Sequence, residues 1–303
     1  KLTFNRFIYK KKTILRHKLE KYPKLQKLVT FVYMKYCGAT GFLHVKPDFY
    51  IIGFAKCGTT SLFEYLISHP NIHPPKGKEI DFFDRLYSRG INWYKVGFPF
   101  TIQKFIEKVF FRKKFLTGEA TPRYIEHPHA INRIKQTTPN AKFIILLRNP
   151  IDRAFSQHNM NVKNDYEINN FNDALKEEPR RISNRIEKMT NDITYYSWNY
   201  DLYAYLEHGL YVDKIKRWME VFPKEQFLII QSEEFLRNTS KTYNDVLKFL
   251  GLPNWEPKEF VLYKKRPYKE KISSNLRNEL VNYFKPHNQR LYDFLGKSFD
   301  WDK

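Results

Sequence analysis

One segment, residues 50–62, constrains the fold of this chain more than any other. Its sequence is Tyr-Ile-Ile-Gly-Phe-Ala-Lys-Cys-Gly-Thr-Thr-Ser-Leu. This pattern predicts a buried strand, a tight loop bounded by Gly53 and Gly58, and the first turn of a helix. Backbone N–H groups at such a loop converge on an anion, and the helix dipole favours negative charge there. The segment therefore predicts a phosphate-binding loop.

The loop differs from the G-x-x-x-x-G-K-[ST] loop of ordinary nucleoside triphosphatases. Gly53 and Gly58 have the spacing of that motif, but Thr59 stands where its lysine would be. The lysine occurs inside the loop instead, as Lys56. The hydroxyl that would bind a metal after the lysine has no clear equivalent. The loop suits a nucleotide phosphate in a site that differs from an ordinary ATP site, and we expect no bound metal.

A second motif follows another apolar run of strand length, residues 143–147. Arg148 comes directly after the run, and Ser156 lies eight positions further on. Arginine presents a charged fork that suits phosphate, and Ser156 would add a hydroxyl donor from the next helix. We expect Arg148 and Ser156 to hold a second phosphate group.

Together the two motifs resemble those of the sulfotransferases that use 3′-phosphoadenosine 5′-phosphosulfate (PAPS). In that family the first motif holds the 5′-phosphosulfate and the second holds the 3′-phosphate. The resemblance spans about residues 48–301 and is closest in pattern to the heparan sulfate N- and 3-O-sulfotransferases. It also rests on residues 79–84 (Glu-Ile-Asp-Phe-Phe-Asp), 90–94, 119–124 (Glu-Ala-Thr-Pro-Arg-Tyr), 211–218, 222–223, 264–268 (Lys-Lys-Arg-Pro-Tyr) and 299–301 (Phe-Asp-Trp).

The resemblance implies a donor site for PAPS, with adenosine 3′,5′-bisphosphate as its product. Sulfuryl transfer requires that donor and acceptor be placed in line and that charge on the leaving phosphate be stabilised. Lys56 would supply that charge. The loop around the 5′-phosphosulfate would be completed by Cys57, Gly58, Thr59, Thr60 and Ser61. A basic lid over the nucleotide would be formed by Lys264, Lys265 and Arg266, unless that run is only a solvated charge cluster.

Glu79 is the candidate general base, since the matching glutamate of the resembling enzymes deprotonates the acceptor hydroxyl. Asp81 stands in place of a family histidine and could support or replace Glu79 near the substrate. Alternatively, both carboxylates are ordinary surface groups beside neighbouring lysines. Ala120 stands in place of a family lysine that assists catalysis, and Arg123 is a candidate for supplying that charge. A histidine base is the remaining alternative, with His69, His73, His127, His129 and His158 as candidates.

Net charge bears on the partner. Lys and Arg number 53 against 32 Asp and Glu, a balance of +21. This excess favours an acidic partner, although compositional bias can contribute to it. With the resemblance, we expect a carbohydrate or glycolipid acceptor, and an anionic one would suit the charge. A glycosaminoglycan, a surface polysaccharide, a glycolipid and a small alcohol stay open.

Two other functional classes are weaker alternatives. A P-loop kinase or NTPase would need a lysine directly before Thr59 and an acidic residue after a strand, but residues 143–147 end in Arg148. A non-enzymatic polyanion-binding protein would explain the charge but not the paired phosphate motifs. Nucleic acid is therefore not the partner that the sequence favours.

The chain divides into two regions. Residues 1–47 alternate basic and apolar residues at near-helical spacing and predict a basic amphipathic helical region. Its apolar face either packs on the domain or provides a peripheral membrane or polyanion contact. Residues 48–303 form the expected sulfotransferase domain.

Within this domain, alternating strands and helices predict an α/β, P-loop-like three-layer fold with a central parallel sheet. Strands are expected at 48–53, 115–118, 143–147 and 227–230. Helices are expected at 59–69, 128–137, 152–163, 199–221, 239–250, 273–284 and 287–295. Residues 164–198 are expected to form a substrate-facing excursion with short helices.

Cys37 and Cys57 are expected to be free thiols, because a bridge would constrain the phosphate loop. The sequence contains no apolar run of about 18 residues, so we expect no membrane span. A cytoplasmic or peripheral membrane location is expected in a prokaryote. A Golgi location would follow if an upstream anchor has been removed, since the chain begins with Lys1.

Overall fold

The computed structural model describes residues 22–261 and 271–301. In these residues, four parallel strands form one sheet in the order β2-β1-β3-β4. The strands are β1 (Phe49–Gly53), β2 (Gly118–Glu119), β3 (Lys142–Leu147) and β4 (Phe227–Gln231). Because all four strands are parallel, the loops that follow them lie together at the carboxyl ends of the strands. The phosphate loop after β1 therefore lies beside the turn after β3.

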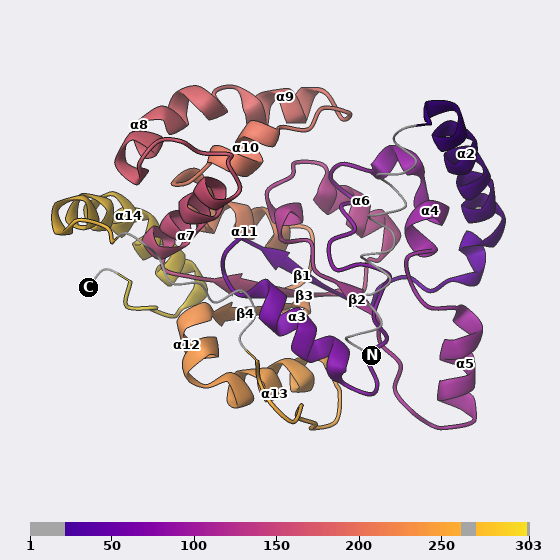
Figure 1. Cartoon of the computed structure of the whole chain (residues 1–303). Coiled ribbons are helices and arrows are strands. Elements are labelled where there is room, and N and C mark those ends of the chain that lie inside the picture. The colour runs from indigo at the N-terminus through magenta and orange to yellow at the C-terminus, as the bar shows by residue number, and fades with distance from the viewer. Residues whose placement is uncertain (1–21, 262–270, 302–303) are drawn as a thin grey trace.

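Helices cover both faces of the sheet (Figure 1). On one face lie α3 (Thr59–Ser68) and α13 (Thr239–Leu250), and on the other lie α6 (Ala130–Thr137) and α11 (Val212–Met219). On the first face, Tyr65 of α3 and Tyr243 of α13 have ring centroids 6.5 Å apart. On the second, the ring centroids of Phe143 in β3 and Trp218 in α11 are 5.3 Å apart. These layers confirm the predicted three-layer α/β fold.

The other described elements lie outside this central sandwich or connect its parts. They are α2 (Pro23–Thr40), η1 (Gly41–Leu43), η2 (Tyr87–Arg89), α4 (Ile91–Lys95), α5 (Thr101–Val109), η3 (Pro122–Ile125), α7 (Pro150–Lys163), α8 (Phe171–Ile182), α9 (Arg185–Asn191), α10 (Trp198–Tyr203), η4 (Glu207–Gly209), η5 (Lys224–Gln226), α12 (Ser232–Arg237) and α14 (Ser274–Leu295).

Helix α2 provides most of the described part of the predicted basic region. Of its residues, Cys37 alone is buried, so most apolar side chains of α2 are not packed on the domain. Both cysteines are free thiols, as predicted. Across residues 22–261 and 271–301, no helix has the length and apolar character needed to cross a membrane.

The single helix predicted over residues 199–221 is wrong. The chain forms α10, then η4, then α11. The break passes Gly209, where an added Cβ would lie 2.8 Å from the ring of Phe284 and 2.9 Å from Pro150. With the backbone in this conformation, any side chain larger than that of Gly209 would collide with α14 and α7.

Side chains from neighbouring helices satisfy the backbone groups that this break releases. The carbonyl of Leu202 accepts hydrogen bonds from Gln157 at 2.9 Å and from Asn161 at 2.6 Å. The carboxylate of Glu178 accepts from the backbone N–H of Leu206 at 2.8 Å. Buried polar groups must find partners, and here α7 and α8 supply them in place of helix hydrogen bonds.

Two further boundaries differ from the prediction, whereas the helices expected within residues 164–198 are confirmed. The tail forms one helix, α14, with Pro286 inside it, rather than two helices. Strand β2 begins three residues later than expected, at Gly118. The excursion over residues 164–198 contains α8 and α9, and Phe171 of α8 packs in a second small core with Phe155 of α7 and Phe284 of α14.

Candidate functional site

The loop after β1 is folded as a cradle of backbone N–H groups. Three of its residues have positive φ: Gly53 at 126°, Lys56 at 73° and Gly58 at 89°. Alternation between the left-handed region and other conformations turns successive N–H groups toward one point. Gly58 directly precedes α3, whose first N–H groups have no acceptor within the helix. The loop and helix together form a site suited to a phosphate or sulfate ester.

Two side chains from other elements hold the backbone of this loop. The carbonyl of Lys56 accepts from Arg148 Nη1 at 3.2 Å, and the carbonyl of Cys57 accepts from Ser232 Oγ at 2.7 Å. Because these donors bind the two carbonyls, two successive peptide groups of the loop are fixed. The loop is therefore preorganised by the turn after β3 and by the start of α12.

The predicted loop residues differ in what they can present to a ligand. Cys57 is buried, and burial raises the pKa of its thiol to about 12, so only its backbone is available. Thr59 and Ser61 are also buried, while Thr60 is partly exposed. The ammonium of Lys56 is partly exposed and lies 3.7 Å from Met160 Sδ.

The second predicted motif lies next to the first. Arg148 follows β3, and its carbonyl accepts from the hydroxyl of Tyr211 at 2.8 Å. The next residue, Asn149, donates its backbone N–H to Glu233 at 2.8 Å and its side-chain amide to the carbonyl of Trp301 at 3.3 Å. The turn that carries Arg148 is thus braced by α12, by the residue that precedes α11 and by the C-terminal segment.

Ser156 is buried in the second turn of α7. The helix that carries it begins at Pro150, two residues after Arg148. The predicted lid residues Lys264, Lys265 and Arg266 lie outside the described residues.

Glu79 lies beside the first turn of the phosphate-loop helix. The ammonium of Lys78 donates to Thr60 Oγ1 at 2.9 Å and lies 3.1 Å from Glu79 Oε1. The backbone of this segment is fixed at the end of β2, because Ala120 N–H donates to the carbonyl of Lys78 at 3.1 Å. The side chain of Glu79 is 37% exposed, so an acceptor can reach it from solvent.

Arg123 is the centre of an ionic cluster behind Glu79. Its guanidinium lies 2.7 Å from Asp81, 3.3 Å from Asp201, 3.8 Å from Asp84 and 3.9 Å from Glu79. Burial, and then the charge of Asp81, raises the pKa of Asp84 to about 6. One guanidinium group therefore lies near four carboxylates, and its distance to Glu79 is the longest of the four.

Asp81 is engaged on both carboxylate oxygens. Oδ1 accepts from Arg123 and Oδ2 accepts from Arg85. Its backbone has a positive φ of 54°. With both oxygens bound by guanidinium groups, Asp81 is poorly placed to take a proton, and the geometry favours Glu79 over Asp81 as the base.

The histidine alternatives are occupied elsewhere. Backbone carbonyls bind the rings of His69, His129 and His158. His73 lies 2.9 Å from the carboxylate of Glu107 in α5. Burial lowers the pKa of His127 to about 3. These contacts do not favour any of the five histidines over Glu79 as the candidate base.

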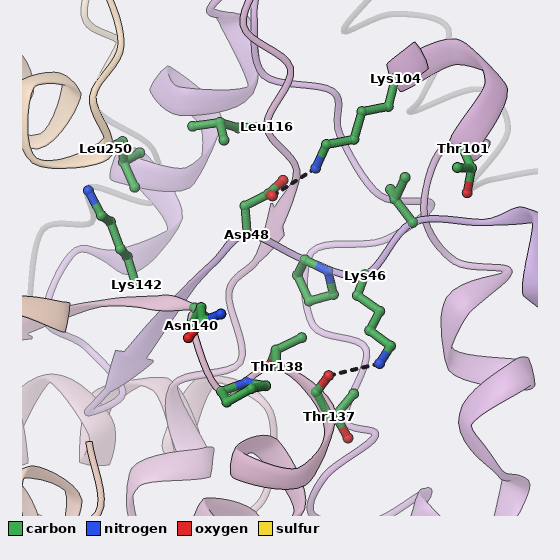
Figure 2. A pocket seen from close by; sticks show the side chains of 14 residues that line it. Lys46, Asp48, Thr101, Lys104, Leu116, Thr137, Thr138, Asn140, Lys142 and Leu250 are labelled. Carbon is green, nitrogen blue, oxygen red and sulfur yellow. Dashed lines mark hydrogen bonds and ion pairs between the residues drawn. The ribbon is translucent and has the colours of Figure 1, made fainter. Parts of the chain in front are cut away.

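A cavity of about 580 Å³ lies at the other end of the sheet (Figure 2). Asp48, just before β1, and Lys142, at the start of β3, both line it. Parallel α/β sheets bind ligands at the carboxyl ends of their strands, where the phosphate loop lies. This cavity is therefore separate from the candidate donor site.

Three residues that build the site were not predicted from the sequence: Lys78, Ser232 and Glu233. Ser232 and Glu233 directly follow β4, whose apolar run ends at Ile230. Polar residues at the end of a predicted parallel strand are expected at the same sheet edge as the phosphate loop, so this signal was available. Lys78 has no such signal, because in the sequence it is only one of the lysines that neighbour Glu79.

Comparisons with known proteins agree with the two phosphate motifs. Residues 46–303 match the family model described as a sulfotransferase domain. The membrane-associated sulfotransferase kil1 of Dictyostelium discoideum is 26% identical over 325 residues, covering 84% of this chain and 66% of that protein. The heparan sulfate glucosamine 3-O-sulfotransferase 3B1 of Mus musculus is 28% identical over 279 residues, covering 84% of this chain and 65% of that protein.

A solved structure is similar over a larger share of its own length. The crystal structure of a sulfotransferase from Alicyclobacillus acidocaldarius is 30% identical and has a TM-score of 0.65. The match covers 86% of this chain and 100% of that one. By contrast, the chain spans just under two thirds of the two curated relatives. The family predicted from the two phosphate motifs is confirmed: this chain belongs to the sulfotransferase domain family.

Proposed function

We propose that this chain transfers a sulfuryl group from PAPS to a hydroxyl, or an amine, of a carbohydrate acceptor. The observation that carries this proposal is the position of Lys78, whose ammonium joins Thr60 of the phosphate-loop helix to Glu79. A candidate base thus stands at the rim of a phosphate cradle. Membership of the sulfotransferase domain family supports the same chemistry.

The residues at the carboxyl ends of β1 and β3 are suited to PAPS as the donor. The cradle of loop and α3 N–H groups would hold the 5′-phosphosulfate, with Lys56 beside it. Arg148 and Ser156 would hold the 3′-phosphate, and the run at 264–266 would cover the nucleotide. Support comes from the hydrogen bond between Arg148 and the carbonyl of Lys56, which makes the two motifs neighbours.

In the proposed reaction the acceptor oxygen attacks sulfur as the bond from sulfur to the 5′-phosphate oxygen breaks. Glu79 takes the acceptor proton, and Lys56 stabilises the negative charge that develops on the leaving phosphate. Lys78 and Arg123 lie beside different oxygens of the Glu79 carboxylate, at 3.1 and 3.9 Å. These two cations orient its oxygens between the loop and the ionic cluster.

The proposed acceptor class rests on the relatives and on charge. One relative is named for transfer to heparan sulfate glucosamine, and a net charge of +21 suits an anionic sugar. The partial exposure of Glu79 suits an acceptor that is larger than the site and remains mostly in solvent. Within this proposal, residues 48–303 act as the catalytic domain and residues 1–47 as a separate basic region.

Single-turnover transfer from radiolabelled PAPS, screened over sulfatable oligosaccharides, tests the proposal. Glu79→Gln keeps the shape of the side chain but removes its basicity. We expect its rate to fall by about 10²–10⁴, the usual range for a general base. Affinity for adenosine 3′,5′-bisphosphate, measured by calorimetry, should change little.

Glu220→Gln is the matched control, because Glu220 is an exposed carboxylate at the end of α11 and should not affect the rate. A Glu79→Gln rate within about threefold of wild type would remove Glu79 from the base role. Tighter calorimetric binding of ATP than of the bisphosphate would instead contradict the donor.

A further inference from the structure

Helix α5 turns its polar side toward the domain. Lys104 pairs with Asp48 at 2.9 Å, and Glu107 pairs with His73 at 2.9 Å. Gln103, on the same side, contacts His73 at 3.1 Å. No residue of α5 is buried, so polar contacts hold the helix in place.

The apolar side of α5 consequently faces solvent. Its members are exposed by between 40% and 71%: Ile102, Phe105, Ile106, Val109 and Phe110, followed by Phe111. Positions i, i+3, i+4 and i+7 make one continuous stripe on a helix. In a globular protein such a stripe normally packs on the core, and here its orientation is reversed.

Helix α2 extends this apolar surface. Its exposed large side chains are Leu25, Leu28, Val29, Phe31, Val32, Tyr33 and Tyr36. A β-bridge between His44, which follows η1, and Phe100, which precedes α5, joins the two regions. Phe42 and Phe100 are exposed at this junction. Figure 1 places α2 and α5 on the same side of the molecule, beyond the β2 edge of the sheet. We call residues 23–43 and 100–114 the α2–α5 face.

The charges on the α2–α5 face are almost all positive. Helix α2 contains three lysines and no Asp or Glu. On the α5 side the cations outside its inward polar face are Lys108, Arg112 and Lys113, while Lys114 donates to the carbonyl of Gly251. The one carboxylate there, Glu107, is paired with His73. Lys46, in the adjoining cavity, adds a further cation (Figure 2).

We propose that the α2–α5 face docks on the surface of an anionic lipid bilayer. Aromatic and aliphatic side chains with flanking Lys and Arg are what an in-plane helix uses at a membrane surface, and anionic headgroups attract such cations. A second copy of this chain is a poor occupant, because two cationic faces of molecules with net charge +21 repel. The phosphate loop lies outside this face, so docking leaves it accessible. The proposal does not depend on the transfer reaction.

Co-sedimentation of the whole chain with vesicles tests the docking. One set of vesicles contains phosphatidylcholine alone, and the other also contains phosphatidylglycerol. We expect binding to the second set and little to the first. The triple variant Phe105→Ser, Phe110→Ser and Phe111→Ser should lower the partition coefficient by about tenfold or more. The triple variant Lys108→Glu, Arg112→Glu and Lys113→Glu should lose the preference for phosphatidylglycerol.

Matched variants elsewhere on the surface control for general changes in polarity and charge. The apolar control is Val162→Ser with Ile168→Ser and Ile193→Ser, and the charge control is Lys163→Glu with Lys176→Glu and Arg180→Glu. All six residues are exposed, and both controls should bind like wild type. Circular dichroism should show the same fold for every variant.

Two results would overturn the docking proposal. One is equal vesicle binding by wild type and both face variants. The other is a lipid-free dimer, seen by light scattering, that the triple serine variant dissociates, because that result would make the face a protein interface.

Discussion

The ammonium of Lys78 donates a hydrogen bond to Thr60 Oγ1 at 2.9 Å. The same ammonium lies 3.1 Å from Glu79 Oε1. A lysine has three N–H donors and can bridge two acceptors in this way. Because Thr60 lies in the first turn of α3, this bridge fixes the carboxylate relative to the phosphate loop.

Lys78→Ala should reduce the single-turnover rate by about tenfold to 100-fold, because misplacement of a catalytic group by about 1 Å has an effect of this size. Affinity for the bisphosphate should change little. Loss of a neighbouring cation also disfavours the ionised carboxylate. The acidic limb of the pH–rate profile should therefore move to higher pH.

Lys78→Arg should restore part of the rate, and Lys76→Ala, a nearby exposed position, should behave as wild type. An unmoved pH profile in Lys78→Ala would mean that Lys78 does not act through Glu79.

Lys56→Met keeps the aliphatic stem but removes the charge. In the proposed reaction Lys56 acts on charge that develops during transfer, so kcat should fall by about 10²–10³ while product binding weakens far less. Rapid-quench transfer and calorimetry with the bisphosphate measure the two quantities separately. Near-normal turnover would exclude Lys56 from the mechanism.

Arg148→Ala should raise the donor KM and erase the preference for a 3′-phosphate. A charge-assisted hydrogen bond contributes about 1.5–3 kcal/mol, so the ratio of bisphosphate to AMP affinity should fall by about tenfold to 100-fold.

Arg148 also holds the carbonyl of Lys56, and Ser232→Ala separates the two effects. Ser232→Ala removes a different loop hydrogen bond, to the carbonyl of Cys57, and should weaken both nucleotides alike. If Arg148→Ala keeps the preference, the 3′-phosphate site has been assigned to the wrong residue.

Glu119 should make stability depend on pH. Its carboxyl is fully buried and accepts from Tyr94 at 2.9 Å, and burial raises its pKa from 4.5 to about 8. Between these two pKa values the folded chain holds a proton that the unfolded chain has released. The contribution of this proton to the free energy of unfolding is therefore fully present below pH 4.5, and it is lost as pH rises through about 8. Glu119→Gln cannot titrate.

Urea unfolding at about pH 5 and about pH 9 should show wild type losing a few kcal/mol relative to Glu119→Gln. Glu225→Gln, at an exposed carboxylate, should follow wild type at both pH values. Parallel stability profiles for wild type and Glu119→Gln would show that Glu119 is already ionised in the folded chain.

Buried strands were the most predictable elements. The runs at 48–53 and 143–147 are close to β1 and β3, because strands buried on both faces are continuous apolar segments. The run at 227–230 is close to β4, although this strand at the side of the sheet is only partly buried. The span 199–221 failed for a non-local reason. Its leucines have helical spacing, but its break is stabilised by Gln157 and Glu178 from other helices. No local window contains those partners.

The site was predictable only where its residues belong to local sequence motifs. Lys56 and Arg148 sit in local motifs, and the parallel sheet brings them together. Arg123 was expected to replace the charge of a lysine at position 120, but three aspartates surround its guanidinium. Asp201 reaches this cluster from a segment far along the chain, and only the fold of α10 brings it there.

The brace between Asn149 and Trp301 joins residues 152 positions apart. Translation proceeds from the N-terminus, and domains begin to fold in that order. The ribosome therefore delivers the phosphate loop and Arg148 well before the segment that supports their turn. Until Trp301 has been synthesised, the turn that carries Arg148 lacks this hydrogen bond. The end of the sheet beside the phosphate loop therefore gains its full support only late in synthesis.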